Sequence, residues 1–487
     1  MSEWDIQVQA KPLSDLMLGL GVYSQDTMIY HLCDDTRKLR FGDAFLCLPR
    51  VVNKERMIQS AIDQGANAVI VVGELHDKLG VPSACLPDMD AAGLMLRRWF
   101  ETEQTSVQCV GITGTDGKTS TAWMLREVLE KHLAAAWSVG TLGWMRNKEN
   151  TIDLGNTTPS LLRNHGLLAL AEQHGVRALV FEVSSHGIAQ ARIAGLPFVA
   201  AVWTTIGHDH LEDHGSYENY LSMKHGFIQS VAQAGGVVVA NADYADITQS
   251  LSAIQDDVLW YGTRGGVGLQ WSVTDVGVQL RDKMQTIGLQ HVPRADFHAE
   301  NLAAVALVMQ ASFGVPLDRF ACLAGHMSTP RGRLEPVSDQ VYIDYAHTAE
   351  GLQRCLLSAR KLTQDKLLLV FGCGGNRDKS KRPEMGAVAE KLADECWLTS
   401  DNPRDEQQKD IVADVLAGMK RPEKIHVVED RSQAIHQAVA ALLPQDVLVI
   451  AGKGHEPYME VQGQRIPWSD QEEVCKALAI REAQACV

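Results

Sequence analysis

The stretch Gly114-Thr115-Asp116-Gly117-Lys118-Thr119-Ser120 decides how this chain is interpreted. An apolar run typical of a β-strand, Val107–Ile112, leads directly into it, and a helical pattern, Thr121–His132, follows. A glycine loop between a strand and a helix is the context of a P-loop, in which backbone N–H groups and the helix N-terminus cradle phosphates. We therefore expect this loop to bind ATP, with Lys118 neutralising the β- and γ-phosphates and the Thr119 hydroxyl reaching Mg²⁺.

The loop is shorter than the usual GxxxxGK[ST] form. That form would require glycine at position 112, where the chain has Ile112. Kinases, GTPases and motor ATPases usually keep that glycine. The shorter GTxGKT form therefore argues against these three classes of nucleotide-binding protein.

Short apolar runs alternate with helical patterns on both sides of the loop, which favours βαβ units and parallel sheets. Three blocks follow from this alternation: residues 1–95, 96–335 and 336–487. The expected strands are Ala44–Leu48, Ala68–Val72, Val107–Ile112, Ala178–Val183, Val199–Thr204, Gly236–Ala240, Val341–Tyr345, Leu367–Phe371, Glu395–Thr399 and Val447–Ala451. The expected helices are Glu55–Gln64, Ala91–Phe100, Thr121–His132 and one that begins near Asn301.

Composition excludes several classes of protein. The net charge of −15 over 487 residues argues against a nucleic-acid binder, which needs a basic face. The ten cysteines form no CxxC pair, so neither a zinc ribbon nor a thioredoxin-like site is indicated. The chain shows no signal peptide and no apolar run long enough to span a bilayer. We expect a cytoplasmic monomer that binds small molecules.

A second group of polar residues is suited to a metal. Glu182 ends a predicted strand where a carboxylate would face the P-loop. The segment Gly207–Gly215 that follows is rich in histidine, aspartate and glutamate and includes His210. Such a segment can be a solvated loop or a zinc site, but no HExxH motif is present and the neighbouring P-loop favours Mg²⁺. Lys224, on the next helix, would be repelled by Mg²⁺ unless it contacts phosphate, faces away or changes its charge.

Taken together, the motifs resemble those of the Mur ligase family from about residue 107 to about residue 470. The resemblance rests on GTDGKTS (114–120), NTTPS (156–160), EVSSHGIAQAR (182–192), HDHLEDHG (208–215), RGRLE (331–335), DYAHT (344–348), GCGGNRDKSKRP (372–383), SDNPR (400–404) and AGKGHE (451–456). It implies an α/β fold of three domains, with a central P-loop ATPase-like parallel sheet and a Rossmann-like C-terminal domain. The domains would bind, in order, a UDP-sugar acceptor, ATP and an amino acid. The implied activity is the ATP-dependent addition of meso-diaminopimelate to UDP-N-acetylmuramoyl-L-alanyl-D-glutamate, through an acyl phosphate, in peptidoglycan precursor synthesis.

The resemblance also implies roles for individual residues. Lys118, Glu182, His210 and Lys224 would be catalytic, and Thr119, Glu182, His210 and a carbamylated Lys224 would hold magnesium. Besides the P-loop, the ATP-binding positions would be Asn301, Arg333 and Asp344. The UDP-muramoyl dipeptide would contact Thr36, Thr157, Thr158, Ser184, Gln190 and Arg192. Diaminopimelate would contact Arg377, Asp401, Asn402, Pro403, Arg404, Gly452 and Glu456, with Arg404 pairing its distal carboxylate and Glu456 its distal ammonium.

The chain departs from the family pattern at several positions. Asp116 replaces the usual P-loop asparagine, which should weaken ATP binding unless its carboxylate contacts the metal. His298 stands where an asparagine is usual. In the first block, Thr36 replaces the usual serine, and residues 49–54 replace the family's glycine and Asp-Gly-His stretch.

These departures leave alternatives open. A paralogous Mur-type ligase could join an amino acid to a different carboxylate acceptor. A folate-type polyglutamate ligase would leave DNPR and GCGGNRDK unexplained. A regulatory or motor ATPase would need no amino-acid site, and a non-catalytic binding protein would be expected to lack the metal-binding residues.

Overall fold

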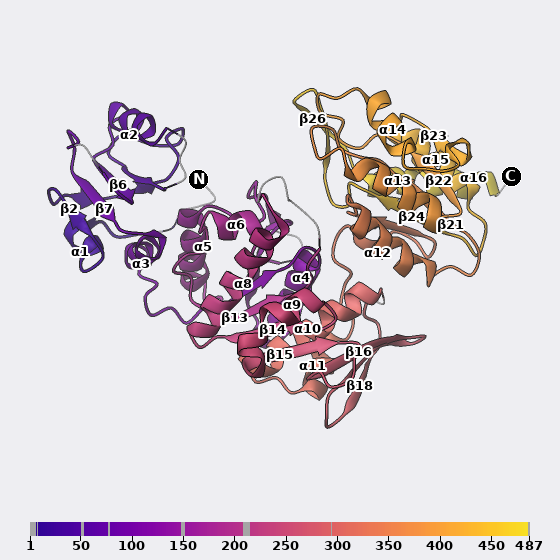
Figure 1. The fold of residues 1–487 in the computed structure, drawn as a ribbon, viewed down its shortest axis with the longest axis horizontal. Coiled ribbons are helices and arrows are strands. Elements are labelled where there is room, and N and C mark those ends of the chain that lie inside the picture. Colours follow the sequence, from indigo (N-terminus) through magenta and orange to yellow (C-terminus); the bar gives the residue numbers. More distant parts are fainter. Residues whose placement is uncertain are drawn as a thin grey trace. The chain divides into compact units, whose positions relative to one another are not determined.

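The computed structural model describes residues 6, 8–49, 53–75, 78–147, 151–207, 215–293 and 295–485 (Figure 1). It divides into two compact units, residues 1–268 with 304–323 and residues 269–303 with 324–487. Among the described residues, no helix is long and apolar enough to cross a membrane.

The first unit begins with a five-stranded sheet whose strand order is β2-β7-β6-β5-β4. The strands are β2 (Val22–Tyr23), β4 (Leu32–Cys33), β5 (Ala44–Cys47), β6 (Ala68–Val72) and β7 (Ser83–Leu86). Strands β4 to β7 are parallel, and β2 pairs antiparallel with β7. Leu46 and Ile70 pack with α1 (Leu13–Met17) and α3 (Met89–Trp99) on one face, and Phe45 and Val69 pack with α2 (Lys54–Asp63) on the other. Helices therefore cover both faces of this sheet.

The same unit continues into a larger sheet with the strand order β11-β10-β9-β12-β8-β13-β14-β15. Its strands are β8 (Gln108–Thr113), β9 (Ala136–Gly140), β10 (Gly143–Met145), β11 (Thr151–Ile152), β12 (Ala178–Glu182), β13 (Phe198–Trp203), β14 (Val237–Asn241) and β15 (Val258–Gly262). The run from β9 to β15 is parallel, and β10 and β11 are antiparallel additions at the edge. The P-loop strand β8 thus lies at the centre, between β12 and β13.

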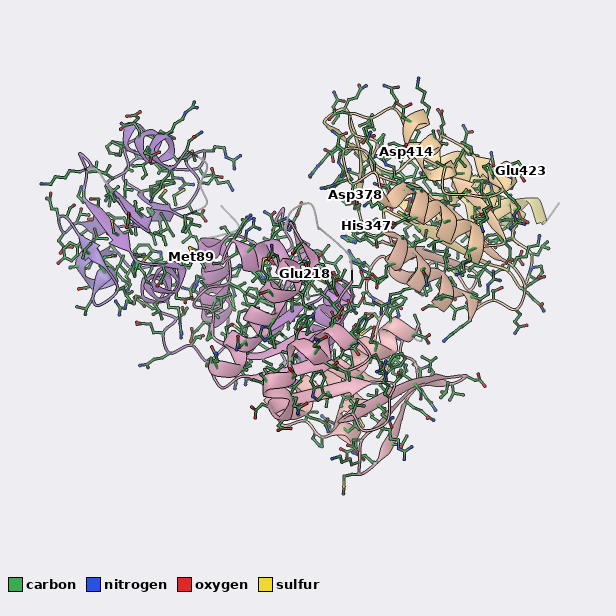
Figure 2. The ribbon with its side chains drawn as sticks, viewed as in Figure 1. Met89, Glu218, His347, Asp378, Asp414 and Glu423 are labelled. Carbon is green, nitrogen blue, oxygen red and sulfur yellow. The ribbon has the colours of Figure 1, made fainter. Side chains whose placement is uncertain are left out.

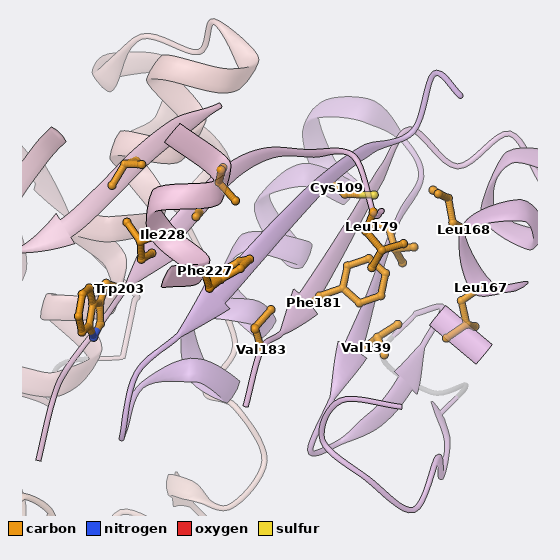
Figure 3. Close-up of a cluster of buried hydrophobic side chains, with 14 of the residues drawn as sticks. Cys109, Val139, Leu167, Leu168, Leu179, Phe181, Val183, Trp203, Phe227 and Ile228 are labelled. Carbon is orange, nitrogen blue, oxygen red and sulfur yellow. The ribbon is translucent and has the colours of Figure 1, made fainter. Parts of the chain in front are cut away.

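Alternating side chains of these parallel strands form two buried layers. Cys109, Leu179 and Phe181 point into the cluster drawn in Figure 3, together with Leu167 of α5 (Leu161–Gln173) and Phe227 of α8 (Tyr217–Gln233). Successive residues on a strand face opposite sides, so buried Val110 and Ile112 face the other layer. Helix α4 (Lys118–Leu133), which follows the P-loop, is buried from Thr119 to Leu129. Because both faces are covered, the strands are nearly continuous apolar runs.

The second unit contains a six-stranded sheet in the order β19-β20-β24-β21-β22-β23. Its strands are β19 (Arg333–Pro336), β20 (Val341–Asp344), β21 (Leu367–Phe371), β22 (Glu395–Leu398), β23 (Ile425–Val427) and β24 (Val447–Ala451). All are parallel except β19, which pairs antiparallel with β20. One face packs against α12 (Ala349–Arg360), α13 (Lys381–Leu392) and α14 (Gln408–Leu416), and the other against α15 (Arg431–Ala441) and α16 (Asp470–Ala485). This doubly wound arrangement matches the expected Rossmann-like domain.

The remaining described elements connect or flank these sheets. In the first unit they are β1 (Lys11–Pro12), β3 (Met28–Ile29), α6 (Ser185–Ala189), α9 (Ala245–Ser250) and η1 (Ser252–Asp257). In the second unit, β16 (Leu269–Thr274), β17 (Gly277–Arg281) and β18 (Thr286–Leu289) form an antiparallel ladder, and η2 (Pro422–Lys424), β25 (Tyr458–Val461) and β26 (Gln464–Pro467) lie farther along the chain. Helix α10 (Asp296–Phe313) crosses from the second unit to the first, and α11 (Leu317–Ala324) follows.

All ten expected strands are present, each within one residue of its predicted ends. All four expected helices begin earlier than predicted, α2 and α3 by one and two residues and the other two by more. Helix α4 begins at Lys118 rather than Thr121, because Gly117 adopts a φ of 84° and lets the chain turn directly into the helix. Helix α10 begins at Asp296, five residues before Asn301. In both cases polar residues in the first turn hide the start of the apolar pattern.

Candidate active site

The P-loop is held against the end of the neighbouring strand β13. Thr204 Oγ1 donates to the Asp116 carbonyl at 2.5 Å, and Thr205 Oγ1 accepts from the Asp116 N–H at 2.8 Å. Gly114 has a φ of 153°, and a Cβ atom there would lie 2.0 Å from Thr204 Oγ1, so only glycine fits. Thr204 and Thr205 fix the loop, and sequence reasoning missed both because a threonine pair carries no recognisable pattern.

Lys118 folds back over the loop. Its Nζ donates to the Gly114 and Thr115 carbonyls, at 2.7 Å in both cases. Thr119 and Ser120 follow in the first turn of α4, where both are buried. The ammonium group therefore lies over the glycine loop, at the N-terminus of a long buried helix, where anions are favoured.

Glu182 lies beside the P-loop, as expected of a carboxylate at the end of β12. The side chain is 2% exposed, and its Oε2 accepts a hydrogen bond from Thr119 Oγ1 at 2.8 Å. Thr141 donates its N–H to Oε1 at 2.9 Å and its hydroxyl to Oε2 at 3.0 Å. Gly140 makes room for this carboxylate, because a Cβ atom there would lie 2.0 Å from Oε1. Gly140 and Thr141 were not predicted.

The acidic and histidine-rich segment cannot be placed in the same way. His210, the expected metal ligand, lies outside the described residues, together with His208, Asp209 and residues 211–214. Within the described residues, no group of three histidine, cysteine, aspartate or glutamate side chains could hold a metal. Immediately before the segment, the Gly207 N–H donates to Thr115 Oγ1 at 2.9 Å, so the chain enters it directly beside the P-loop.

Lys224 also lies next to the P-loop. Its side chain is 1% exposed, and its Nζ donates to the Gly114 carbonyl at 3.0 Å and lies 4.5 Å from the centre of the Tyr220 ring. Tyr220 in turn shares a hydrogen bond of 3.0 Å with Thr115 through its hydroxyl. Lys118 and Lys224 therefore both donate to the Gly114 carbonyl.

The residues expected to contact the muramoyl peptide come together around the end of β12. Thr157 Oγ1 lies 3.2 Å from Thr141 Oγ1, and Thr158 Oγ1 lies 3.0 Å from Ser184 Oγ. Arg192 donates to the Thr158 carbonyl at 2.6 Å and to Gln190 Oε1 at 2.7 and 2.9 Å. Thr158, Ser184, Arg192 and Gln190 form one hydrogen-bonded group, in which the Thr158 hydroxyl donates to the Glu182 carbonyl at 2.8 Å. Thr157 is joined to the Glu182 carboxylate separately, through Thr141.

Thr36 lies in the N-terminal sheet region of the same unit. It is buried, and its hydroxyl lies 4.0 Å from Met57 Sδ. Two residues earlier, burial raises the pKa of Asp34 above its usual value, and a hydrogen bond from the Ser160 side chain opposes this shift. Ser160 caps α5 two residues after Thr158, so the segment that holds Thr36 lies close to the predicted acceptor contacts.

The second unit contains the other residues expected to contact ATP, and two of them lie together. Arg333 and Asp344 are directly paired in the β19–β20 ladder, and the Arg333 guanidinium carbon lies 5.0 Å from the centre of the Tyr345 ring. The Asp344 carboxylate accepts from the N–H groups of Leu334 and Ala346, at 2.7 and 2.8 Å. Asn301 is 1% exposed, and neither polar atom of its amide has a partner within the described part of the chain. A buried amide of this kind is suited to a bound ligand.

Four motifs of the second unit follow the carboxyl ends of adjacent parallel strands. DYAHT follows β20, AGKGHE follows β24, GCGGNRDK follows β21 and SDNPR follows β22. Buried Arg382 anchors the glycine loop by donating to the Gly374 carbonyl at 3.1 Å, and it donates to Asp414, labelled in Figure 2, at 2.8 Å. Ligands of open α/β sheets bind at such strand ends.

The residues expected to bind diaminopimelate meet at these strand ends. Asn402 Nδ2 donates to Glu456 Oε2 at 2.8 Å, and Arg404 Nη1 donates to the Gly375 carbonyl at 2.8 Å. Asp401 lies against Gly452, where an added Cβ atom would be 2.4 Å from Asp401 Oδ2. Pro403 completes the turn, and Arg377 is exposed at the end of the glycine loop.

Two domain families match this chain. The Mur ligase middle domain matches residues 112–309, and the Mur ligase glutamate ligase domain matches residues 332–454. A UDP-N-acetylmuramoyl-L-alanyl-D-glutamate–2,6-diaminopimelate ligase of Ectopseudomonas mendocina is 35% identical over 492 residues, covering 97% of this chain and 99% of the relative. The chain belongs to the Mur ligase family. This Mur ligase is therefore an ATP-dependent enzyme that forms amide bonds.

Other comparisons agree with this membership. A ligase of the same name from Caldanaerobacter subterraneus is 35% identical to this Mur ligase and covers 93% of it. A solved structure of a ligase of that name has a TM-score of 0.71 at 27% identity and covers 98% of the chain. The MurF ligase of Thermotoga maritima, solved with ADP, has a TM-score of 0.61 at 18% identity and shows the shared fold.

Sequence reasoning missed a buried lysine in the C-terminal domain of this Mur ligase. Lys453 is fully buried, and its Nζ donates to Asn402 Oδ1 at 2.9 Å and to Glu456 Oε2 at 3.1 Å. A buried lysine requires paired acceptors, so it fixes both side chains. Its place between two glycines in AGKGHE is the signal that could have revealed it.

Proposed function

We propose that this Mur ligase joins meso-diaminopimelate to the terminal carboxylate of UDP-N-acetylmuramoyl-L-alanyl-D-glutamate, with ATP converted to ADP and phosphate. The arrangement of Arg404, Asn402 and Glu456 at the ends of β22 and β24 carries the proposal, because the guanidinium lies two residues along the chain from Asn402, which holds the Glu456 carboxylate. An amino acid whose distal end bears both a carboxylate and an ammonium is complementary to that pair. The names of the relatives support the same substrates.

The first step is phosphoryl transfer from ATP to the acceptor carboxylate. Lys118 exchanges the loop carbonyls for phosphate oxygens, and the N-terminus of α4 faces the transferred group. On the second unit, the Asn301 amide and the Arg333 guanidinium are the donors assigned to the nucleotide. The acceptor carboxylate attacks the γ-phosphorus, and the product is an acyl phosphate and ADP.

Magnesium is assigned to the pair formed by Thr119 and Glu182. The hydroxyl and carboxylate oxygens, 2.8 Å apart and almost fully buried, are the oxygen donors that this ion prefers. His210 is the further proposed ligand. Bound magnesium supplies charge screening for the γ-phosphate. Thr141 holds the Glu182 carboxylate in place for this role.

Lys224 is proposed to carry a carbamate. Its amine is buried directly behind the P-loop, where an ammonium would repel a nearby cation. Addition of CO₂ to the neutral amine forms an N–C bond and releases one proton, which leaves an anion at this position. Mass measurement of the intact protein in bicarbonate and in CO₂-free buffer tests the modification.

The second step is attack by the diaminopimelate amine on the acyl phosphate. Arg404 and Glu456 bind the distal end of the amino acid and leave its other amine to form the new bond. The C–N bond forms, the C–O bond to phosphate breaks, and a proton is lost from nitrogen. Thr157, Thr158, Ser184, Gln190 and Arg192 are the residues proposed to hold the peptide portion of the acceptor.

The three predicted blocks are proposed as the functional domains: residues 1–95 for the acceptor, 96–335 for ATP and 336–487 for the amino acid. Strand β19 joins the C-terminal sheet from Arg333 onward, and α3 packs on the N-terminal sheet up to Trp99. By these contacts the first domain would extend to about Trp99 and the third would begin at about Arg333, each within a few residues of the proposed limits.

The direct test is phosphate release from ATP in reactions from which one substrate at a time is omitted. We expect release only when the UDP-muramoyl dipeptide and meso-diaminopimelate are both present. Release without an amino acid would indicate an ATPase, and release with diaminopimelate and another carboxylic acid would indicate the paralogous ligase. Residues 49–54 favour testing that second acceptor class, since they replace the family's usual stretch; Arg50, Val51 and Val52 lie outside the described residues.

A further inference from the structure

The short strand β25 packs its backbone onto the DNPR turn. The Arg404 N–H donates to the Glu460 carbonyl at 3.0 Å, and the Gln462 N–H donates to the Arg404 carbonyl at 2.9 Å. Arg404 and Val461 therefore form an isolated parallel bridge. Arg404 adopts a left-handed φ of 51°, a conformation that costs energy outside glycine and that these backbone bonds stabilise.

Glu460 also binds the turn through its side chain. Arg404 Nε donates to Glu460 Oε2 at 3.0 Å, and the Glu460 N–H donates to Asn402 Oδ1 at 2.8 Å. The Arg404 and Glu460 side chains are 19% and 29% exposed, so the pair is open to a ligand on one side. With the Gly375 carbonyl, Glu460 engages two of the five N–H donors of the guanidinium.

The two carboxylates of this site have different partners. Glu456 is bound by Asn402 at 2.8 Å and by the buried ammonium of Lys453 at 3.1 Å. Glu460 is bound by Arg404 itself. The positive charge of Arg404 is therefore already balanced before any amino acid binds.

This balance changes what the arginine can accept. A ligand that ends in a carboxylate alone would bring an unmatched negative charge next to Glu460. A ligand that ends in an ammonium alone would leave the remaining Arg404 donors without an acceptor. A distal end with both groups adds no net charge and can place its carboxylate on Arg404 and its ammonium near a glutamate.

We propose that Glu460 is a specificity-determining residue of the amino-acid site. It holds Arg404 through Nε and selects an amino acid with a zwitterionic distal end over one with a distal carboxylate only. The inference rests on the proposed function and adds to it a residue that none of the motifs contains.

The test compares kcat/KM for meso-diaminopimelate and for 2-aminoheptanedioic acid, which lacks only the distal amine, in the wild-type enzyme and in Glu460→Gln. Glutamine keeps an acceptor for Arg404 Nε but removes the charge. We expect the preference for diaminopimelate to fall by about tenfold or more, mainly through a lower KM for the analogue. Glu395→Gln removes a glutamate of the same domain that pairs with Lys366 at 2.8 Å, at the other end of β22, and should leave the preference unchanged.

The outcomes separate the two proposals. An unchanged preference in Glu460→Gln, with diaminopimelate still used, would overturn the role of Glu460 and leave the proposed function intact. A fall of the same size in Glu395→Gln would also overturn it, since the effect would then be one of general charge. Failure of the wild-type enzyme to use either amino acid would reject the proposed function and, with it, this inference.

Discussion

The hydroxyl of Thr119 donates a hydrogen bond to the carboxylate of Glu182 over 2.8 Å. The two residues are 63 positions apart in the chain and meet because β8 and β12 are adjacent parallel strands. Thr141 extends the contact to Thr157, so one chain of hydrogen bonds joins the P-loop to the NTTPS motif. The pair therefore links the proposed magnesium site to the proposed acceptor site.

Glu182→Gln should lower kcat by at least about 100-fold, because a neutral amide holds the cation less well and the cation screens the charge of the transferred phosphoryl group. The magnesium concentration for half-maximal rate should rise as well. Kinetics over a magnesium series measure both effects. Glu172→Gln, near the C-terminal end of α5, is the matched control; an equal loss there would contradict the assignment.

Asp116→Asn should tighten ATP binding. The P-loop aspartate adds a negative charge near the phosphates, and its removal should gain about 1 kcal/mol, or about fivefold in Kd. Calorimetric titration with a non-hydrolysable ATP analogue measures the change. Asp257→Asn makes the same charge change at an exposed position at the end of η1 and should leave Kd unchanged. Weaker binding in Asp116→Asn would mean that the carboxylate contacts the metal.

Asp470→Asn should destabilise the C-terminal domain. Arg431 and Asp470 are both fully buried and joined by two hydrogen bonds of 2.7 Å, and Arg431 also donates to the carbonyls of Ser400 and Ala451. Breaking a buried pair leaves an uncompensated charge and costs about 3–5 kcal/mol. Denaturant unfolding measures the loss.

The same substitution should raise KM for the amino acid, because Arg431 fixes the two strand ends that lead into DNPR and AGKGHE. Lys476→Gln breaks the exposed pair with Glu473 on the same helix and should cost less than about 1 kcal/mol. A similar loss of stability in Asp470→Asn and in Lys476→Gln would show that the buried pair contributes no more than the exposed one.

His298→Asn should make the enzyme less sensitive to acid. Burial lowers the pKa of His298 to about 3, whereas the pKa of a histidine in the unfolded chain is near its ordinary value of 6.5. Above pH 6.5, His298 is neutral in both the folded and the unfolded chain. As the pH falls from 6.5 toward 3, His298 binds a proton in the unfolded chain but stays neutral in the folded chain. The free energy of unfolding therefore falls.

At about pH 5 this difference amounts to about 2 kcal/mol, and asparagine removes it. Unfolding measured at about pH 7.5 and pH 5 should therefore show a smaller loss in His298→Asn than in the wild-type enzyme. His132→Asn, at an exposed position of α4, serves as control. An unchanged acid sensitivity in His298→Asn would contradict the effect of burial.

The parallel strands were predictable because both faces of each sheet are covered, which makes β21 and β24 unbroken apolar runs with polar loops at both ends. The antiparallel ladder β16 to β18 was not predicted. Its strands mix buried residues such as Leu269 and Val278 with exposed ones such as Gln279 and Arg281, so no apolar run marks them. Two-residue strands such as β2 are too short to leave a pattern.

The site was predictable where its chemistry is concentrated in a motif, as in the P-loop and DNPR. It was not predictable where a residue acts through tertiary contact. Thr141 and Thr204 are ordinary threonines until the adjacent strand ends bring them to Glu182 and Asp116. Glu460 belongs to no motif, and only the packing of β25 on the DNPR turn brings it to Arg404.

The central claim is tested most directly by the mass of the product formed from ATP, UDP-N-acetylmuramoyl-L-alanyl-D-glutamate and meso-diaminopimelate. We predict one new species, heavier than the acceptor by a single diaminopimelate residue, formed in equal amount to the phosphate released. An acceptor that is recovered unchanged, from folded enzyme that binds ATP, would contradict the account and direct the search for another carboxylate to the N-terminal residues 49–54.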